Sequence, residues 1–273
     1  MKKLIFAAAL AIGMATAPAM AAPVFSLGGY QGPIKIKFSN FENLTNGLSV
    51  DSQNYGIVNI TSIADQIGNN LWANGGTSGY LTGVFNGITI NDVSGSAPNV
   101  NATADGGHLD IYLNSSSVDA AQGTAGYGNG GCAIGGLCYH TITDAGGTLF
   151  LSLDFAPGAD ALGNTLVGTF TTATAPFSGT ALGYLDVVGG AYASMFDTNG
   201  QTTAIGTLAD LLLQNTFCPN GDPNCQAGGP AIGDWQLLSD DPVRGSVPEP
   251  GTTALLGLGL VGLFVGMRRR RSV

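Results

Sequence analysis

Short apolar runs rich in β-branched and aromatic residues recur through the middle of the chain, and small polar residues separate them. In 34–38 apolar and polar residues alternate with a period of two, the pattern of a half-buried strand. Runs of Val, Ile, Thr, Phe and Tyr bounded by Gly, Asn, Asp and Ser are typical of strands. The segments with this character, each predicted to be a strand, are 34–38, 55–63, 80–93, 108–113, 148–155, 166–171, 184–188, 210–217 and 235–238. Their number and spacing predict a mainly β domain, a β-sandwich or a jelly-roll-like fold.

Two longer apolar runs lie near the ends of the chain, and the first is typical of a secretory signal peptide. Residues 4–15 are mostly apolar, follow Lys2 and Lys3, and precede the small residues of Ala19-Met20-Ala21. A run of about a dozen residues is shorter than the roughly 20 that span a bilayer, which argues against an uncleaved anchor. We therefore expect an N-terminal signal helix over 1–22, with the Sec machinery and signal peptidase as partners.

The second apolar run predicts a transmembrane helix over 251–267, because these 17 residues carry no charge. Four arginines follow it, Arg268, Arg269, Arg270 and Arg271, and their positive charge favours the cytoplasmic side as a stop-transfer signal. The rest of the chain is then expected outside the cytoplasm, in agreement with the predicted signal peptide.

The segment just before this run is Val247-Pro248-Glu249-Pro250. Pro-Glu-Pro, then an apolar helix, then an arginine cluster resembles the PEP-CTERM sorting signal of Gram-negative bacteria. The resemblance implies processing by exosortase, a transient anchor in the inner membrane, and delivery to the cell surface or to an extracellular matrix rich in exopolysaccharide. The expected organisation is a signal peptide (1–22), an ectodomain (23–245) and a sorting signal (246–273), and the alternative is a stiff linker before an ordinary tail anchor.

The charge of the ectodomain narrows its partners. Without the residues of the two end segments, 17 of the 18 acidic residues remain, against Lys35, Lys37 and Arg244 alone, for a formal charge of −14. Nucleic acid and anionic membranes bind clustered Lys and Arg, so we expect no nucleic-acid partner. All these acids except Glu42 are Asp, and 43 residues are Gly, so a turn-rich β protein is expected.

Four cysteines in an exported protein predict disulfides. The nearest-neighbour pairs are Cys132 with Cys138 and Cys218 with Cys225, each within its own Gly- or Pro-rich loop. The alternative of a zinc site is disfavoured, because these spacings lack a partnering histidine pattern.

Motifs of hydrolases, metalloproteases and nucleotide-binding proteins are absent from the sequence. The two histidines are the natural general bases near neutral pH. His108 lies two residues from Asp110, and His140 lies two residues from Cys138, but a strand residue with a polar neighbour and a disulfide loop explain these spacings better. We therefore expect no enzyme, no cofactor and no metal.

The leading hypothesis is a non-enzymatic surface or matrix protein that works with extracellular polysaccharide in adhesion or flocculation. A lectin-like module is the alternative, with exposed aromatic residues stacking on sugars, for which Trp72, Tyr127, Tyr139 and Trp235 are the candidates. A secreted glycoside hydrolase with paired Asp carboxylates is the third hypothesis.

Overall fold

The computed structural model describes residues 23–128, 138–223, 230–240 and 242–248. The expectation of a mainly β protein is confirmed, and each predicted strand overlaps a strand of the structure. The main strands are β1 (Gly32–Leu44), β2 (Gln53–Asp65), β3 (Asn70–Ala73), β4 (Tyr80–Ser96), β5 (Asn99–Asn114), β8 (Thr148–Ala156), β9 (Leu166–Phe170), β10 (Gly179–Gly189), β13 (Leu211–Pro219), β14 (Leu237–Asp240) and β15 (Val243–Val247). Shorter elements are η1 (Gly76–Ser78), η2 (Ala120–Gly126), β6 (Tyr127–Gly128), β7 (Cys138–Tyr139), α1 (His140–Thr143), α2 (Ala193–Phe196), β11 (Gln201–Thr202) and β12 (Leu208–Ala209).

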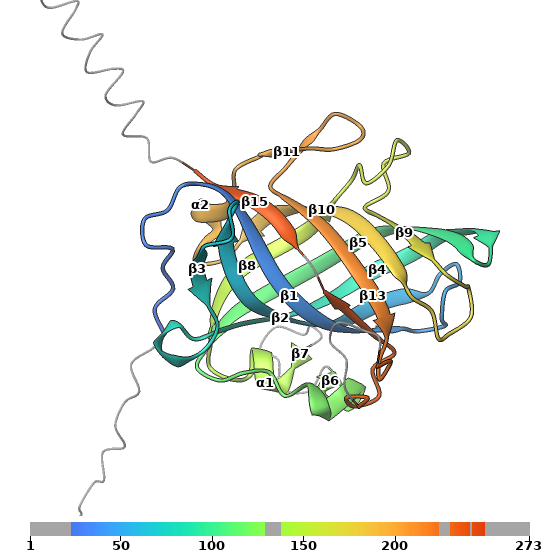
Figure 1. Cartoon of the computed structure of the whole chain (residues 1–273), viewed down its shortest axis with the longest axis horizontal. Helices are drawn as coiled ribbons and strands as arrows, with labels where there is room; N and C mark the ends of the chain where they lie inside the picture. Colours follow the sequence, from blue (N-terminus) through green and yellow to red (C-terminus); the bar gives the residue numbers. More distant parts are fainter. Residues whose placement is uncertain (1–22, 129–137, 224–229, 241, 249–273) are drawn as a thin grey trace, which may run out of the picture.

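The long strands form one antiparallel sheet that closes on itself into a cylinder (Figure 1). Going round it, β1 pairs with β2, β2 with β4, β4 with β5, β5 with β8 and β9, these with β10, and β10 with β13. Strands β14 and β15 pair with β13 on one side and with β1 on the other. The expected sandwich or jelly roll of two packed sheets is therefore corrected to a single closed sheet, in which pairing of β1 with β15 removes the open edges that a sandwich keeps.

Alternation along the strands separates an apolar interior from a polar outer face. In β1, Ile34, Ile36 and Phe38 are buried inside the cylinder, while Lys35 and Lys37 point outward. Because successive side chains of a strand point to opposite faces, this period is the reason that the sheet can close around an apolar core.

Strand β5 bends at two glycines as it passes from one partner strand to the next. Its second half pairs with β8 from His108 to Leu113, and its first half pairs with β9 from Val100 to Ala104. Between them Gly106 and Gly107 adopt φ values of 71° and 111°, which disfavour any residue with a Cβ. A Cβ at Gly107 would also lie 2.6 Å from the ring of Phe155, so the bend depends on glycine here.

Aromatic packing fills one end of the cylinder. The ring of Phe25 contacts those of Trp72, Phe150, Tyr192 and Phe196 at centroid distances of 4.6 to 6.4 Å. The segment just before β1 therefore belongs to the core of the fold.

Part of the outer face is also covered, by the excursion between β5 and β8 that carries η2, β6, β7 and α1 (Figure 1). Tyr139 and Ile142 of this excursion pack with Ile57 and Val84 of the sheet and with Trp235. A second apolar cluster therefore lies outside the cylinder.

The predicted signal helix (1–22) and transmembrane helix (251–267) lie outside the described residues. No helix within the described ranges is long and apolar enough to cross a membrane. Both segments remain predictions.

Candidate functional site

The sorting motif begins inside the last strand of the fold. Ser246 and Val247 belong to β15, where Val247 pairs with Gly32 of β1 and is 8 % exposed. Pro248 follows as an exposed residue without secondary structure. Glu249, Pro250 and the four arginines from Arg268 to Arg271 lie outside the described residues. Val247 and Pro248 therefore mark the point where the closed sheet ends and the motif continues.

The interior of the cylinder contains a buried carboxyl group, that of Glu42. Its Oε1 accepts a hydrogen bond from Asn40 Nδ2 at 2.8 Å, and its Oε2 accepts one from Asn54 Nδ2 at 2.8 Å. The hydroxyl of Ser239 also donates to Oε1, and Asn215 Nδ2 donates to that hydroxyl at 3.3 Å. These side chains from β1, β2, β13 and β14 form a polar cluster between the apolar ends of the core.

Burial raises the pKa of Glu42, because the ionised form loses its hydration, and the three hydrogen bonds from Ser239, Asn54 and Asn40 offset only part of this effect. The alternation in β1 points Glu42 inward with Ile34, Ile36 and Phe38. The sequence did not indicate this position, because the alternation of apolar and polar residues is clear only over 34–38, and Asn40, Phe41 and Glu42 break it.

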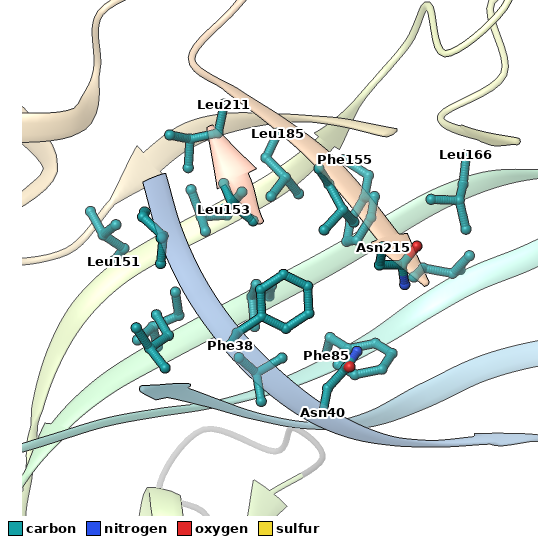
Figure 2. Close-up of a pocket in the computed structure, with 18 of the residues that line it drawn as sticks. Phe38, Asn40, Phe85, Leu151, Leu153, Phe155, Leu166, Leu185, Leu211 and Asn215 are labelled. Carbon is teal, nitrogen blue, oxygen red and sulfur yellow. The ribbon is translucent and has the colours of Figure 1, made fainter. Parts of the chain in front are cut away.

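The two cavities beside this cluster are too small for an organic ligand. One is about 70 Å³ and is lined by Phe38, Phe85, Phe155 and Asn215 among other side chains (Figure 2). The second, lined by Glu42 and Phe217 among others, is about 50 Å³. Ligand pockets usually measure about 300–1,000 Å³, whereas a water needs roughly 10–15 Å³. The interior can therefore hold water beside the buried Oδ1 atoms of Asn54 and Asn215, which have no protein partner.

A serine, a histidine and two aspartates meet on the outer face of β5 and β8. His108 Nδ1 lies 2.6 Å from Asp154 Oδ1, and His108 Nε2 lies 3.1 Å from Asp110 Oδ1. Ser152 Oγ lies 3.3 Å from His108 Nε2 and donates to Asp110 Oδ1 at 2.6 Å. The predicted proximity of His108 and Asp110 is thus present, and the register of β5 with β8 adds Ser152 and Asp154.

This cluster resembles a Ser-His-Asp triad in composition but not in protonation. The hydrogen bond with Asp110 is the main reason that the pKa of His108 is raised to about 9, and that with Asp154 adds to it. At neutral pH the ring therefore carries both protons, each directed at a carboxylate. A protonated imidazole cannot accept the serine proton, and Ser152 donates to Asp110 instead. The geometry supports an ion pair of His108 with Asp110 and Asp154 on the sheet surface.

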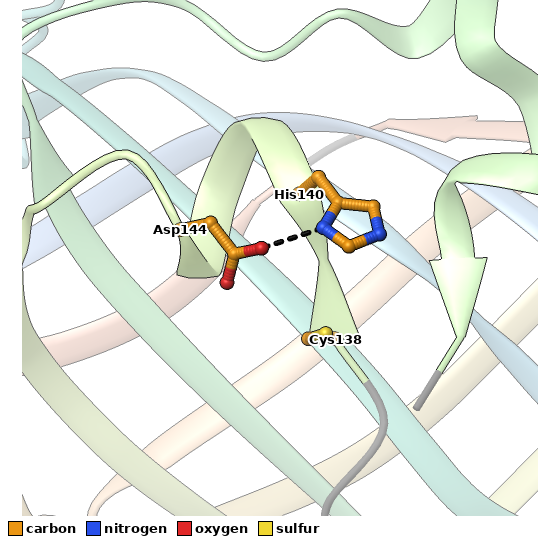
Figure 3. Close-up of side chains that lie close together, drawn as sticks. All are labelled: Cys138, His140 and Asp144. Atoms are coloured by element: carbon orange, nitrogen blue, oxygen red, sulfur yellow. Dashed lines mark hydrogen bonds and ion pairs between the residues drawn. The ribbon is translucent and has the colours of Figure 1, made fainter. Parts of the chain in front are cut away.

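His140 and Cys138 also lie close together, with Asp144 (Figure 3). His140 Nδ1 is 2.5 Å from Asp144 Oδ2, an exposed pair four residues apart. A thiolate ligand requires a free cysteine, and neither Cys138 nor Cys218 is free. The predicted partners Cys132 and Cys225 lie outside the described residues, so the two disulfide pairs stay predictions.

The aromatic residues that the lectin hypothesis names are not available for stacking on a sugar. Trp72, Tyr139 and Trp235 are 4 %, 0 % and 3 % exposed. Tyr127 is partly buried against the outer apolar cluster, and its hydroxyl donates to the Phe85 carbonyl at 2.7 Å. The expectation of exposed stacking platforms at these four positions is therefore wrong. Trp72 packs with Phe25 in the core of the cylinder, and Tyr127, Tyr139 and Trp235 belong to the apolar cluster between the sheet and the excursion.

A groove of about 680 Å³ follows the outer face of β5, β9, β10 and β13. Asn101, Thr169, Thr180 and Thr216 stand directly opposite one another across these strands. Neighbouring strands lie about 4.8 Å apart, so the row presents hydroxyl and amide groups at regular intervals. Asp160, the one charged residue of the lining, accepts hydrogen bonds from Leu162 and Asn164 of its own loop.

Comparison with known proteins identifies the end segment. The family model of the PEP-CTERM protein-sorting motif matches residues 246–271. No curated protein and no solved structure matches the chain. The motif implies processing by exosortase and a protein that is exported, anchored in the membrane and then placed at the cell surface. The chain therefore carries a PEP-CTERM protein-sorting motif at residues 246–271, as the residues Val247 to Pro250 and the arginine cluster predict.

Proposed function

We propose that the chain is a non-enzymatic protein of the cell surface or extracellular matrix, delivered by exosortase, whose closed sheet binds exopolysaccharide and so contributes to adhesion or flocculation. The observation that carries the proposal is the sorting motif, which begins within strand β15 of the sheet. Because no linker separates fold from motif, the unit that exosortase would release is the closed sheet itself.

The groove across β5, β9, β10 and β13 supports polysaccharide as the partner. Its volume of about 680 Å³ lies within the range of ligand sites. The row of Asn101, Thr169, Thr180 and Thr216 offers donors and acceptors that match the hydroxyl groups of a sugar chain. Val167 and Leu182 add an apolar patch between polar neighbours, as the C–H faces of sugars require.

The protonation of His108 supports a binding protein over a hydrolase. A hydrolytic serine needs a neutral histidine as base, and the two carboxylates around His108 keep it protonated.

The sorting part of the proposal is tested by replacing Pro248, Glu249 and Pro250 with alanine in a host that carries exosortase. We expect the variant to be exported but held in the inner membrane at uncut size, because the segment that the enzyme grips is lost. The measurement is cell fractionation with immunoblotting, and an exosortase deletion is the control. If the variant reaches the surface at the same shortened size as the unmodified protein, the tail is an anchor and not a processing signal.

The binding part is tested by polysaccharide pull-down with Thr180→Val, which keeps the β-branched shape and removes one hydroxyl of the groove. One hydrogen bond contributes about 0.5–1.5 kcal/mol, so a loss of roughly two- to tenfold in affinity is expected. Thr148→Val is the matched control, because Thr148 is an exposed strand residue outside the groove. Equal binding by both variants and the unmodified protein would exclude the groove.

A further inference from the structure

All three Lys and Arg residues of the ectodomain lie close together on its outer face. Lys35 and Arg244 are directly opposite each other on the paired strands β1 and β15, and Lys37 is two residues further along β1. None of the three forms an ion pair within the described part of the chain. A protein with a formal ectodomain charge of −14 thus places its Lys and Arg side chains in one area and, within the described residues, without a carboxylate partner.

This arrangement works against the stability of the sheet. Like charges directly opposite on neighbouring strands repel each other. An acidic residue in place of Lys35 or Arg244 would form a stabilising ion pair with the basic residue opposite it. Acidic residues are abundant in the chain, but neither position has one. An anion between Lys35 and Arg244 would relieve this repulsion.

A pocket of about 350 Å³ is located at this pair. Lys35, Arg244, Gln66, Gln201 and Ser246 line it, from β1, β15, the turn after β2, and β11. The backbone of Gly200 closes one side, and a Cβ there would lie 3.0 Å from Ser246 Oγ. Lys37 is not part of the lining. Two cations therefore lie beside two amides and a hydroxyl in a pocket at the lower end of the ligand-site range.

We propose that this pocket binds an anionic sugar residue, with Arg244 and Lys35 holding its carboxylate or phosphate and Gln66, Gln201 and Ser246 contacting its hydroxyl groups. Arginine matches the two oxygens of such an anion in a bidentate manner, and lysine adds a point charge. The proposal rests on the proposed association with polysaccharide and adds a second site, distinct from the uncharged row of the groove. In a polysaccharide with both neutral and anionic sugars, the anionic sugars would bind here, at strand β15, in which the sorting motif begins.

The test is native affinity electrophoresis of the purified full chain in gels that contain either alginate, a uronate polymer, or dextran, which is neutral. Lys35→Gln and Arg244→Gln remove one pocket cation each. Lys37→Gln is the matched control, because it makes the same change of charge two residues away and outside the pocket. Mobility in a gel without polysaccharide corrects for the charge of each variant.

We expect alginate to retard the unmodified chain, and we expect Lys35→Gln and Arg244→Gln to weaken its binding about tenfold, the effect of losing one charge-assisted hydrogen bond. Lys37→Gln should change it less than about twofold. Free glucuronate or glucose 6-phosphate should compete with alginate for the chain, and glucose should not. If glucuronate competes more strongly, the pocket prefers a carboxylate; if glucose 6-phosphate does, it prefers a phosphate.

Three results would overturn the site: no retardation by alginate, equal retardation by dextran, or an equal loss in Lys37→Gln and Arg244→Gln. Because electrophoresis does not depend on processing, none of these results bears on sorting. Failure of the sorting proposal would instead appear in the fractionation of the Pro248–Glu249–Pro250 variant.

Discussion

Pairing of strand β15 in the sheet should protect the peptide bond after Arg244 from trypsin. Truncating a buried side chain of this strand should increase the cleavage rate by a factor that follows from the lost burial. The ectodomain has trypsin sites after Lys35, Lys37 and Arg244, and all of them lie in the paired strands β1 and β15. A protease binds an extended segment of several residues, so cleavage after Arg244 requires β15 to leave the sheet. The cleavage rate therefore reports how often the cylinder opens at its last strand.

The burial of two valines sets the magnitude. Val243 and Val247 are 9 % and 8 % exposed and both belong to the core of the cylinder. Burying a valine contributes about 1.5–3 kcal/mol, so exposing both costs about 3–6 kcal/mol. With 1.36 kcal/mol for each factor of ten, β15 is expected to be open for about one part in 160 to about one part in 26,000 of the time.

The perturbation is Val247→Ala, which removes two buried methyl groups and costs roughly 1.6 kcal/mol. Cleavage after Arg244 should then accelerate about fifteenfold, while cleavage after Lys35 and Lys37 should change little, because β1 is held by β2 on its other side. The assay is a time course of trypsin digestion with intact-mass detection.

The control is Val188→Ala, since Val188 is 55 % exposed on β10. Rapid cleavage of the unmodified protein after Arg244, or equal rates for the two valine variants, would show that β15 does not close the sheet.

Four further predictions concern Glu42, His108, Ser152 and the cysteines. Burial raises the pKa of Glu42 above its ordinary value of 4.5, so the contribution of this side chain to the free energy of unfolding is complete below pH 4.5 and is lost as the pH rises through the folded-state pKa. Glu42→Gln should abolish this decline in urea unfolding above pH 4.5, and an unchanged slope would contradict it. The pKa of His108 is raised to about 9, so its contribution to the free energy of unfolding is complete below pH 6.5 and is lost as the pH rises through about 9. Because the side chain is 39 % exposed, His108→Gln should lower the free energy of unfolding by only about 1 kcal/mol near pH 6 and should not change it near pH 10. A fluorophosphonate probe should leave Ser152 unlabelled, and labelling would revive the hydrolase hypothesis. Non-reduced peptide mapping should show the linked pairs Cys132–Cys138 and Cys218–Cys225, against which a crossed link would count.

The strands were predictable because their signal is local. Alternation in 34–38 and the Gly, Asn and Asp residues between the apolar runs depend on neighbours in the sequence, and the structure has a strand at every predicted run. Strand β5 is longer than predicted, because Asp105-Gly106-Gly107 has the composition of a turn. In the structure these residues bend the strand without ending it, since β9 pairs with the residues before them.

Closure of the sheet could not be predicted, because it depends on partners far apart in the chain. Pairing of Lys35 with Arg244 joins the first long strand to the last, and nothing in either segment specifies the other. The burial of the aromatic residues could not be predicted for the same reason. Trp235 is buried because Tyr139 and Ile142 cover the outer face of the sheet, and that contact links segments with no local signal for each other.

The sequence was sufficient to predict the sorting motif but not the side chains that surround His108. Val247 to Pro250 and the arginine cluster are consecutive in the sequence, so recognition needed no fold. The partners of His108 required the register of β5 with β8, which brings Ser152 and Asp154 to a histidine more than forty residues away. The spacing to Asp110 alone did not reveal that the histidine is protonated.

The junction of Val247 and Pro248 explains how one short segment can serve both the fold and the sorting motif. Every residue of β15 has its register partner in β1, and the last of these partners, Gly32, is opposite Val247. Proline lacks the N–H that would continue the ladder, so Pro248 ends the strand where the motif needs an extended chain. A cut at or beyond Pro248 therefore leaves the cylinder intact, whereas a cut between Val243 and Val247 would first have to expose two core valines. Processing at or beyond Pro248 is thus compatible with an intact closed sheet.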